Sequence, residues 1–147
     1  MFIKQISIFL ENKSGRMAQI TGLLAENQIN IHALTIAETT DFGILRLIVS
    51  DPDKAAEILK SNGIMAKATN VVAVAMEHKP GGLAGVMRKT AALNLSIEYM
   101  YAFAGSLKAT GHDAVVILKL TNQDEAVKIM SESGIKIINS DEILKER

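Results

Sequence analysis

The chain has 147 residues, of which 48% are hydrophobic and 22% are charged, a composition typical of a soluble globular protein rather than a disordered one. Its 16 basic residues balance its 16 acidic residues. Residues 1–70 contain seven of each sign and the remaining residues contain nine of each. This balance excludes a basic surface for nucleic acid or an acidic membrane. The absence of cysteine excludes disulfides, thiolate metal sites and cysteine nucleophiles.

The N-terminal residues Met1 to Gln5 lack the basic region and long apolar core of a secretion signal. The longest apolar run, Val71 to Met76, is far shorter than the roughly 20 residues that cross a bilayer. We therefore expect a cytoplasmic protein without a membrane partner.

The first 70 residues contain the patterns of six elements. Strand-forming residues occur at 3–10, 30–38 and 42–50, and a further strand begins at Ile64. Apolar residues between Met17 and Leu24 have helical spacing and predict a helix that ends near Asn27. A second helix follows residue 51. The order β-α-β-β-α-β is that of the ferredoxin-like unit.

The second helix has clear start and stop signals. Asp51 can accept hydrogen bonds from the unpaired N–H groups of a helix start, and Pro52 suits the first helical position, where an N–H group is not needed. Gly63 suits the left-handed residue just beyond the helix end. A turn is expected at residues 39–41.

The same order of elements begins again near Val71. The residues match at an offset of 66 up to the second strand and at an offset of 71 beyond it. The five extra residues lie in the segment 105–111, which has glycine at each end and is expected to be a hairpin tip, where insertions are tolerated. The sequence thus predicts two repeats, 1–70 and 71–147. The matching pairs at an offset of 66 are Glu11/Glu77, Lys13/Lys79, Gly15/Gly81, Ala18/Ala84, Ala25/Ala91 and Ile31/Ile97.

The second repeat is expected to have an apolar sheet face that its own helices do not cover. If side chains alternate along the strands, this face contains Val71, Ala73, Val115 and Ile117. These side chains are too apolar to remain in water, so we expect them to pack against the first repeat or a second chain. Residues 140–144 have the pattern of a capped helical turn.

Two strand-to-helix corners are the main candidates for a ligand site: residues 12–17 and their counterpart, residues 78–83. A helix start directs unpaired N–H groups outward and has partial positive charge, so it attracts a carboxylate or phosphate. Glycine at the corner lets a ligand approach the backbone. The alternative is that Gly15 and Gly81 only turn the chain.

These corners resemble those of ACT domains, small regulatory modules that are attached to or act on enzymes of amino-acid metabolism. The resemblance covers nearly the whole chain. It rests on Asn12-Lys13-Ser14-Gly15-Arg16-Met17 with Asn30-Ile31, and on His78-Lys79-Pro80-Gly81-Gly82-Leu83 with Ser96-Ile97. The resemblance implies a ferredoxin-like fold, paired domains, and a small amino acid bound at a domain interface close to the corners.

Each corner departs once from the family pattern, with Ser14 in place of the usual proline and His78 in place of the usual Asp or Asn. The resemblance implies that N–H groups around Gly15 to Met17 and around Gly81 to Leu83 are expected to bind ligand carboxylates. Asn12, Asn30 and His32 are candidates for the amino and side-chain ends of the ligand. The full candidate set is Asn12, Lys13, Ser14, Gly15, Arg16, Met17, Asn30, Ile31, His32, His78, Gly81, Gly82 and Leu83.

No catalytic or metal site is expected. The histidines have no partner ligands at helical or hairpin spacing, and the carboxylates show no acid–base pairing. Tyr99, Tyr101 and Phe103 alternate along a strand as in RNA-binding sheets, but the neighbouring strand supplies no aromatic residue, so packing is the better account.

Two functions remain open. The first is a stand-alone amino-acid sensor that forms a homodimer, uses no cofactor and acts on an enzyme of amino-acid metabolism. The second is a regulatory interaction subunit whose ligand pocket has been lost. The off-pattern residues Ser14 and His78 favour this second function. An enzyme is not expected, because a fold alone supplies no reaction.

Overall fold

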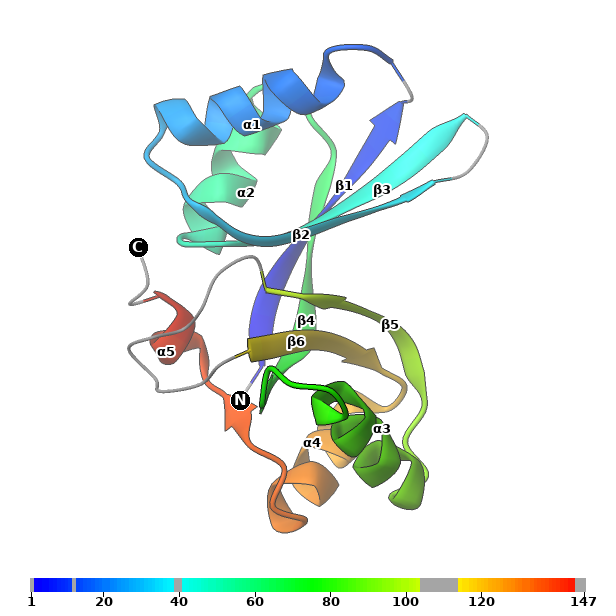
Figure 1. The fold of residues 1–147 in the computed structure, drawn as a ribbon. Helices are drawn as coiled ribbons and strands as arrows, with labels where there is room; N and C mark the ends of the chain where they lie inside the picture. The colour runs from blue at the N-terminus through cyan, green and yellow to red at the C-terminus, as the bar shows by residue number, and fades with distance from the viewer. Residues whose placement is uncertain (1, 12, 39–40, 104–113, 145–147) are drawn as a thin grey trace. The chain divides into compact units, whose positions relative to one another are not determined.

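The computed structural model describes residues 2–11, 13–38, 41–103 and 114–144 (Figure 1). The chain divides into two compact units, which we call the N-terminal repeat (residues 4–69) and the C-terminal repeat (residues 70–144 with residues 2–3). The division into domains 1–70 and 71–147 stays a prediction. Every helix in the described ranges is too short or too polar to cross a membrane.

The N-terminal repeat contains the predicted β-α-β-β-α-β order. Its sheet has the strand order β2-β3-β1-β4, with β3 antiparallel to both β1 and β2. Both helices pack on one face of this sheet (Figure 1). The ferredoxin-like prediction is confirmed for this repeat. Its elements are β1 (Ile3–Glu11), α1 (Arg16–Glu26), β2 (Ile31–Glu38), β3 (Phe42–Val49), α2 (Pro52–Ser61) and β4 (Ala66–Met76).

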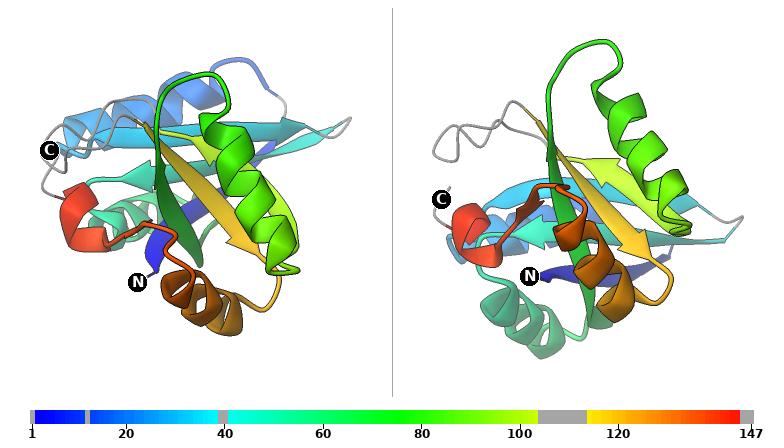
Figure 2. Two further views of the ribbon diagram at one scale, coloured as in Figure 1. Left: turned by 60° about the horizontal axis from the view of Figure 1, so that its bottom comes forward. Right: turned by 90° about the horizontal axis from the view of Figure 1, so that it is seen from below.

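The C-terminal repeat has the same architecture. In its sheet β4 is paired with β6 on one side and with β7 on the other, and β5 lies beyond β6. Helices α3 and α4 pack together on one face of this sheet (Figure 2). The ferredoxin-like prediction is confirmed here too. Its further elements are α3 (Gly82–Ala92), β5 (Ile97–Ala102), β6 (Ala114–Leu120), α4 (Gln123–Glu132), β7 (Ile137–Ile138) and α5 (Ser140–Leu144).

One strand, β4, serves both repeats. Residues 66–69 belong to the N-terminal repeat and residues 70–76 belong to the C-terminal repeat. The sequence predicted two strands here, one from Ile64 and one from Val71, and this prediction was wrong. The segment between Ala66 and Met76 contains neither glycine nor proline, so nothing in it ends the strand before the next one begins.

Each repeat has its own apolar core between sheet and helices. In the N-terminal repeat, Ile6, Ile8 and Leu10 alternate along β1 toward the helices, where Ile20 and Leu59 are buried against them. The corresponding core of the C-terminal repeat contains Val72, Val74, Val116, Leu118, Leu120, Val86 and Met130. The helical spacing predicted for α1 and α2 therefore places their apolar stripes on the sheet, as expected.

The other face of the C-terminal sheet is also buried. Val71, Ala73, Val115 and Ile117 alternate with the core residues and are between 0% and 2% exposed. Their burial is confirmed, and what packs on them stays a prediction. On the same face Tyr101 pairs with Ile117 and Tyr99 pairs with Lys119, which confirms that the two tyrosines share one face of β5.

The predicted helix ends agree with the structure. The Asp51 carboxylate accepts a hydrogen bond from the Lys54 N–H group at 3.1 Å, and Gly63 has a left-handed φ of 71°. The helical turn at Ser140–Leu144 forms α5, and the Asn139 N–H group donates to Glu142 Oε2 at 2.9 Å. Residues 39 and 40 of the predicted turn and the predicted hairpin tip at 105–111 lie outside the described residues.

Candidate functional site

The corner between β1 and α1 is a tight backbone turn that ends at Gly15. The Lys13 N–H group donates to the Glu11 carbonyl oxygen at 2.8 Å, and the Arg16 N–H group donates to the Lys13 carbonyl oxygen at 3.3 Å. Gly15 has a φ of 86°, a left-handed conformation that favours glycine. Helix α1 therefore begins at Arg16 with Gly15 as its N-cap and without a side-chain cap.

The corner between β4 and α3 repeats this geometry. The Lys79 N–H group donates to the Glu77 carbonyl oxygen at 3.1 Å, and the Gly82 N–H group donates to the Lys79 carbonyl oxygen at 2.9 Å. Gly81 has a φ of 87°, and α3 also lacks a side-chain cap. Proline at residue 80 and serine at the matching residue 14 thus support the same turn.

These internal bonds reduce the set of amides that a ligand could use. The first helical N–H group of α1, on Arg16, is already bonded within the corner. Helix geometry leaves the next two amides, on Met17 and Ala18, without intrahelical acceptors. In α3 the same positions are Leu83 and Ala84. A carboxylate at either corner would therefore meet the second and third amides of the helix.

Each corner also carries an exposed ion pair. The Lys13 ammonium lies 2.8 Å from the Glu11 carboxylate, and Lys79 pairs with Glu77 at the matching place. The hydrogen bond and charge of Lys13 lower the pKa of Glu11, with a smaller contribution from the charge of Arg16. Lys79 likewise lowers the pKa of Glu77, and Glu77 raises the pKa of Lys79. Both carboxylates are therefore ionised near neutral pH.

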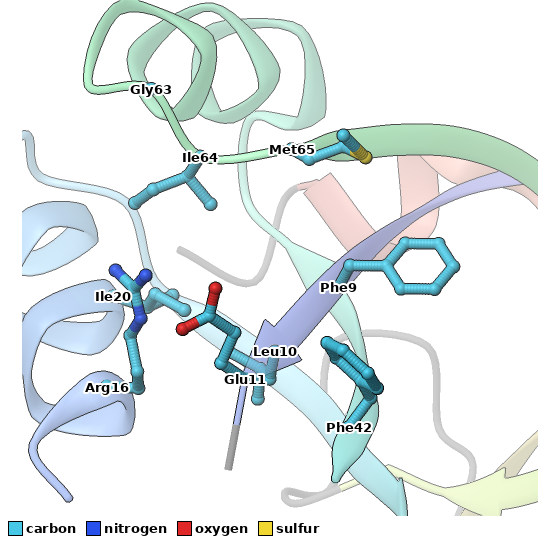
Figure 3. A pocket seen from close by; sticks show the side chains of 9 residues that line it. All are labelled: Phe9, Leu10, Glu11, Arg16, Ile20, Phe42, Gly63, Ile64 and Met65. Carbon is cyan, nitrogen blue, oxygen red and sulfur yellow. The ribbon is translucent and has the colours of Figure 1, made fainter. Parts of the chain in front are cut away.

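A pocket of about 320 Å³ lies beside the corner of the N-terminal repeat (Figure 3). Its charged side is formed by Arg16 and Glu11, whose end groups point to the same space below Ile64 (Figure 3). The Arg16 guanidinium donates one hydrogen bond to Gln19 Oε1 at 3.0 Å. Among the described residues no carboxylate lies within 4.0 Å of the Arg16 guanidinium. The two charges of the pocket are thus not paired with each other.

The opposite side of the pocket is apolar. Phe9, Phe42 and Met65 line it and are 62%, 55% and 73% exposed (Figure 3). The β1–β3 register pairs Phe42 with Glu11, and the Phe9 N–H group donates to the Met65 carbonyl oxygen at 3.3 Å. Strand pairing therefore brings together three side chains that are distant in the sequence. None of the three was among the predicted site residues.

The C-terminal repeat has different residues at the places that form this pocket. At an offset of 66, Gly82 replaces Arg16 and Ala75 replaces Phe9, and at an offset of 71, Lys136 replaces Met65. The acidic residue is kept, because Glu77 replaces Glu11. The combination of a guanidinium and large apolar side chains is thus confined to the N-terminal repeat, although both repeats have the same corner.

The predicted residues at the start of β2 lie away from the N-terminal corner. Asn30 follows the C-terminal end of α1, whereas the corner precedes its N-terminal end, and an 11-residue helix is about 16 Å long. Asn30 exchanges hydrogen bonds with Ser50, at 2.9 and 3.0 Å. Ile31 packs on the core, and His32 is only 6% exposed at a β-bulge. Within one repeat, these residues and the corner therefore cannot contact the same small ligand.

A second hollow lies at the C-terminal end of α1, and the C-terminal repeat has a matching hollow at the end of α3. In the N-terminal repeat it has a volume of about 510 Å³ and is lined by Asn30, Asp51 and Lys54 among others. The matching hollow of the C-terminal repeat, about 290 Å³, includes Ser96 and Glu125. Lys54 also donates to the Asn27 carbonyl oxygen at 2.9 Å. Glu125 replaces Lys54 and Asn122 replaces Asp51, so the N-terminal hollow has one charge of each sign and the C-terminal hollow has a single negative charge.

The remaining predicted residues are placed as follows. Lys13 and Ser14 are exposed at the N-terminal corner, Met17 is partly buried against the core, and Asn12 lies outside the described residues. At the C-terminal corner His78 and Leu83 are exposed. Of the predicted residues that the structure describes, only Arg16 lines the pocket of Figure 3. No group of three or more histidine or acidic side chains in the described part of the chain is arranged to hold a metal ion.

Comparisons with known proteins relate this geometry to one family. Residues 1–146 match the family described as an ACT domain pair. Protein BT0572 from Bacteroides thetaiotaomicron is 43% identical, with a TM-score of 0.88 over 99% of this chain and 97% of that chain. The ligand-free regulatory subunit of aspartate kinase from Thermus thermophilus has the same fold, with 16% identity and a TM-score of 0.60 over 89% of this chain and 92% of its own.

A curated relative matches a shorter segment. The acetolactate synthase small subunit of Buchnera aphidicola subsp. Baizongia pistaciae is 36% identical over 44 residues. This match covers 30% of the chain and 28% of that subunit, so the chain spans less than a third of the length of this relative.

Proposed function

This chain belongs to the family of ACT domain pairs, and on that premise we propose that it is a regulatory protein that binds a free amino acid and has no catalytic activity. One observation carries the proposal: a pocket of about 320 Å³ opens beside the β1–α1 corner, where the uncapped start of α1 and the Arg16 guanidinium both favour a carboxylate. The proposal locates the ligand at this corner. The Gly81 corner, where Gly82 replaces Arg16, is a second half-site that need not be occupied.

The partner is proposed to be an enzyme of amino-acid metabolism in the cytoplasm. The ligand would alter this partner only if it binds two arrangements of the protein with different affinity. The similarity to a regulatory subunit of aspartate kinase and to part of a small subunit of acetolactate synthase supports a partner of this class.

A second copy of the chain is the proposed partner for the edge of the N-terminal sheet. Strand β2 is the outer strand of this sheet, and its apolar side chains Leu34 and Ile36 are each 43% exposed. Exposed apolar edge strands tend to associate unless charge or coverage prevents it. Light scattering at several protein concentrations, with Ile36→Lys as the disruptive variant, tests the homodimer.

Thermal shift and calorimetry with each of the twenty amino acids test the ligand. A ligand at about 100 times its Kd stabilises the folded state by about 2.7 kcal/mol, which raises the melting temperature measurably. A shift with at least one amino acid at millimolar concentration is expected. If no amino acid shifts the melting temperature or gives a calorimetric signal, the proposal is wrong.

The alternative is a regulatory interaction subunit without a ligand pocket. The exposure of Phe9, Phe42 and Met65 favours it, because exposed apolar patches also mark protein contacts. Replacing Gly15 by valine separates the two functions, since a β-branched residue is strained at a φ of 86° and disturbs the corner. A sensor would lose its ligand response, whereas an interaction subunit would keep its partner.

A further inference from the structure

We propose that the pocket of the N-terminal repeat selects amino acids with an apolar side chain and binds the whole zwitterion. Arg16 receives the carboxylate, Glu11 receives the ammonium group, and the apolar side formed by Phe9, Phe42 and Met65 receives the side chain. This inference rests on the proposed amino-acid binding and specifies its ligand class and its place in the chain.

The charges support a zwitterion rather than a simple anion. The Arg16 guanidinium has five N–H donors, and the hydrogen bond to Gln19 uses one of them. The Glu11 carboxylate is bonded to Lys13, but a carboxylate can accept about four hydrogen bonds. A ligand with a carboxylate alone would leave Glu11 facing a like charge, whereas an α-amino acid supplies both charges on one carbon atom.

The apolar side of the pocket determines the side-chain class. Phe42 pairs with Glu11, two residues beyond Phe9 on β1, so Phe9 and Phe42 lie on the same face of the sheet, and Met65 lies beside Phe9 through the backbone hydrogen bond. All three are more than half exposed, so a ligand side chain that covers them removes apolar surface from water. The volume of about 320 Å³ lies at the lower end of the range of ligand pockets, which fits one amino acid rather than a nucleotide.

The difference between the repeats predicts one such ligand per chain. In the C-terminal repeat, Gly82 and Ala75 supply neither a guanidinium nor an aromatic ring at the matching places. The equivalent acidic residue, Glu77, is nevertheless present and paired with Lys79. Glu11 therefore has a matched control residue, Glu77, in the same molecule, and Arg88 in α3 provides an arginine outside the pocket.

The experiment is calorimetry on the full-length chain with each of the twenty L-amino acids. The expected result is binding of amino acids with large apolar side chains, such as L-phenylalanine, L-leucine and L-methionine, with one ligand per chain. If only acidic, basic or small polar amino acids bind, this inference is wrong and the proposed function stands. If no amino acid binds, both fail.

Two variants in the pocket and two controls in the C-terminal repeat locate the ligand. Arg16→Gln and Glu11→Gln are each expected to raise the Kd for the best apolar amino acid by roughly tenfold to one-hundredfold, since each removes a charged hydrogen-bond partner. The controls Arg88→Gln and Glu77→Gln, in the C-terminal repeat, are expected to change it by less than about twofold. An apolar amino acid whose Kd is the same in all four variants would overturn the inference but leave amino-acid binding intact.

Substitution of Phe42 tests the apolar contact separately from the charges. Phe42→Ser is expected to raise the Kd, whereas Phe42→Leu, which keeps an apolar side chain, is expected to restore most of the affinity. The melting temperature of each ligand-free variant shows that the fold is kept. Equal affinity in both variants would contradict the placement of the ligand side chain.

Two analogues test the zwitterion directly. 3-Phenylpropanoate lacks the ammonium group and phenethylamine lacks the carboxylate, and each is expected to bind at least roughly tenfold more weakly than L-phenylalanine. If 3-phenylpropanoate binds as tightly as L-phenylalanine, then Glu11 does not receive the ammonium group, and the pocket is one for apolar carboxylates in general.

Discussion

The backbone of Gly82 lies against the carbonyl group of Glu77, so that a Cβ atom on residue 82 would be 2.0 Å from the carbonyl oxygen of residue 77. This contact occurs at the start of α3, where the chain turns back from β4. Arg16 occupies the matching place in the N-terminal repeat. The C-terminal corner is therefore closed more tightly than its counterpart and has no room for a side chain there.

Gly82→Ala is expected to destabilise the folded state by about 2–3 kcal/mol, because the clash is with backbone atoms that cannot move aside cheaply. Chemical denaturation measures this change. The control is Gly22→Ala in the middle of α1, where a Cβ atom meets nothing within 4 Å. It is expected to stabilise the protein by about 0.5–1 kcal/mol. Equal effects of the two substitutions would contradict the close approach.

The left-handed glycines at the two corners should respond alike to substitution. Gly15→Ala and Gly81→Ala are each expected to destabilise the fold by about 1–2 kcal/mol, since alanine is strained at a φ of 86° or 87° although the space around it is open. Denaturation midpoints measure the loss. Gly85→Ala, within α3, is the control and should not destabilise the protein. A loss at only one corner would show that the two turns are not equivalent.

The cap of α2 is expected to contribute about 1 kcal/mol. Asp51→Ala removes the acceptor of the Lys54 N–H group and leaves that group without its side-chain partner. Asp53→Ala is the control, because its ion pair with Lys4 is solvent-exposed and should change stability by less than about 0.5 kcal/mol. Urea denaturation distinguishes the two variants. A loss at Asp53 as large as that at Asp51 would argue against the capping role.

Acid stability should depend on the two corner ion pairs. The hydrogen bonds and charges of Lys13 and Lys79 hold the pKa values of Glu11 and Glu77 below the ordinary 4.5. The pairs therefore stabilise the fold above the unfolded pKa of 4.5, and this contribution is lost as the pH falls through the lower folded pKa.

The double variant Glu11→Gln/Glu77→Gln is expected to lose less stability than the parent on acidification through this range, by a small amount because both pairs are exposed. Melting temperatures at a series of pH values and low salt measure the difference. Parallel curves for the two proteins would show that the pairs contribute nothing. On the alkaline side, the pairing with Glu77 raises the pKa of Lys79. Its contribution to stability is therefore complete below the unfolded pKa of 10.5, and it is lost as the pH rises through the higher folded pKa.

The sequence predicted the fold well because its signals were local and occurred twice. Asp51-Pro52 and Gly63 mark the ends of α2, and the corner glycines mark the starts of α1 and α3. The boundary between the repeats was harder, because the strand predicted from Ile64 and the strand predicted from Val71 form one uninterrupted strand, β4. Whether a strand ends there depends on its hydrogen-bonded neighbours, which a local pattern does not contain.

The candidate site was predicted only in part. Arg16 was included because it is next to Gly15, but Phe9, Phe42 and Met65 were not included, since their proximity depends on the register of β1 and β3 and on the path of the chain after α2. One signal was available: in β1 the residues Ile6, Ile8 and Leu10 alternate toward the core, which places Phe9 on the other face. A large aromatic residue on the strand face that points away from the core is a candidate for contact with a ligand or another protein.

Because both repeats share β4, the alternation of its side chains between the two faces depends on the number of residues in this strand. Ala66 packs on one core and Val72 and Val74 pack on the other, all within a single extended segment without a turn. Insertion or deletion of one residue between 67 and 71 would turn the β4 side chains on one side of the change to the opposite face of the sheet. Such single-residue changes should be far less tolerated here than in a loop that connects two repeats, so the number of residues between Ala66 and Val72 is constrained as strongly as the core of either repeat.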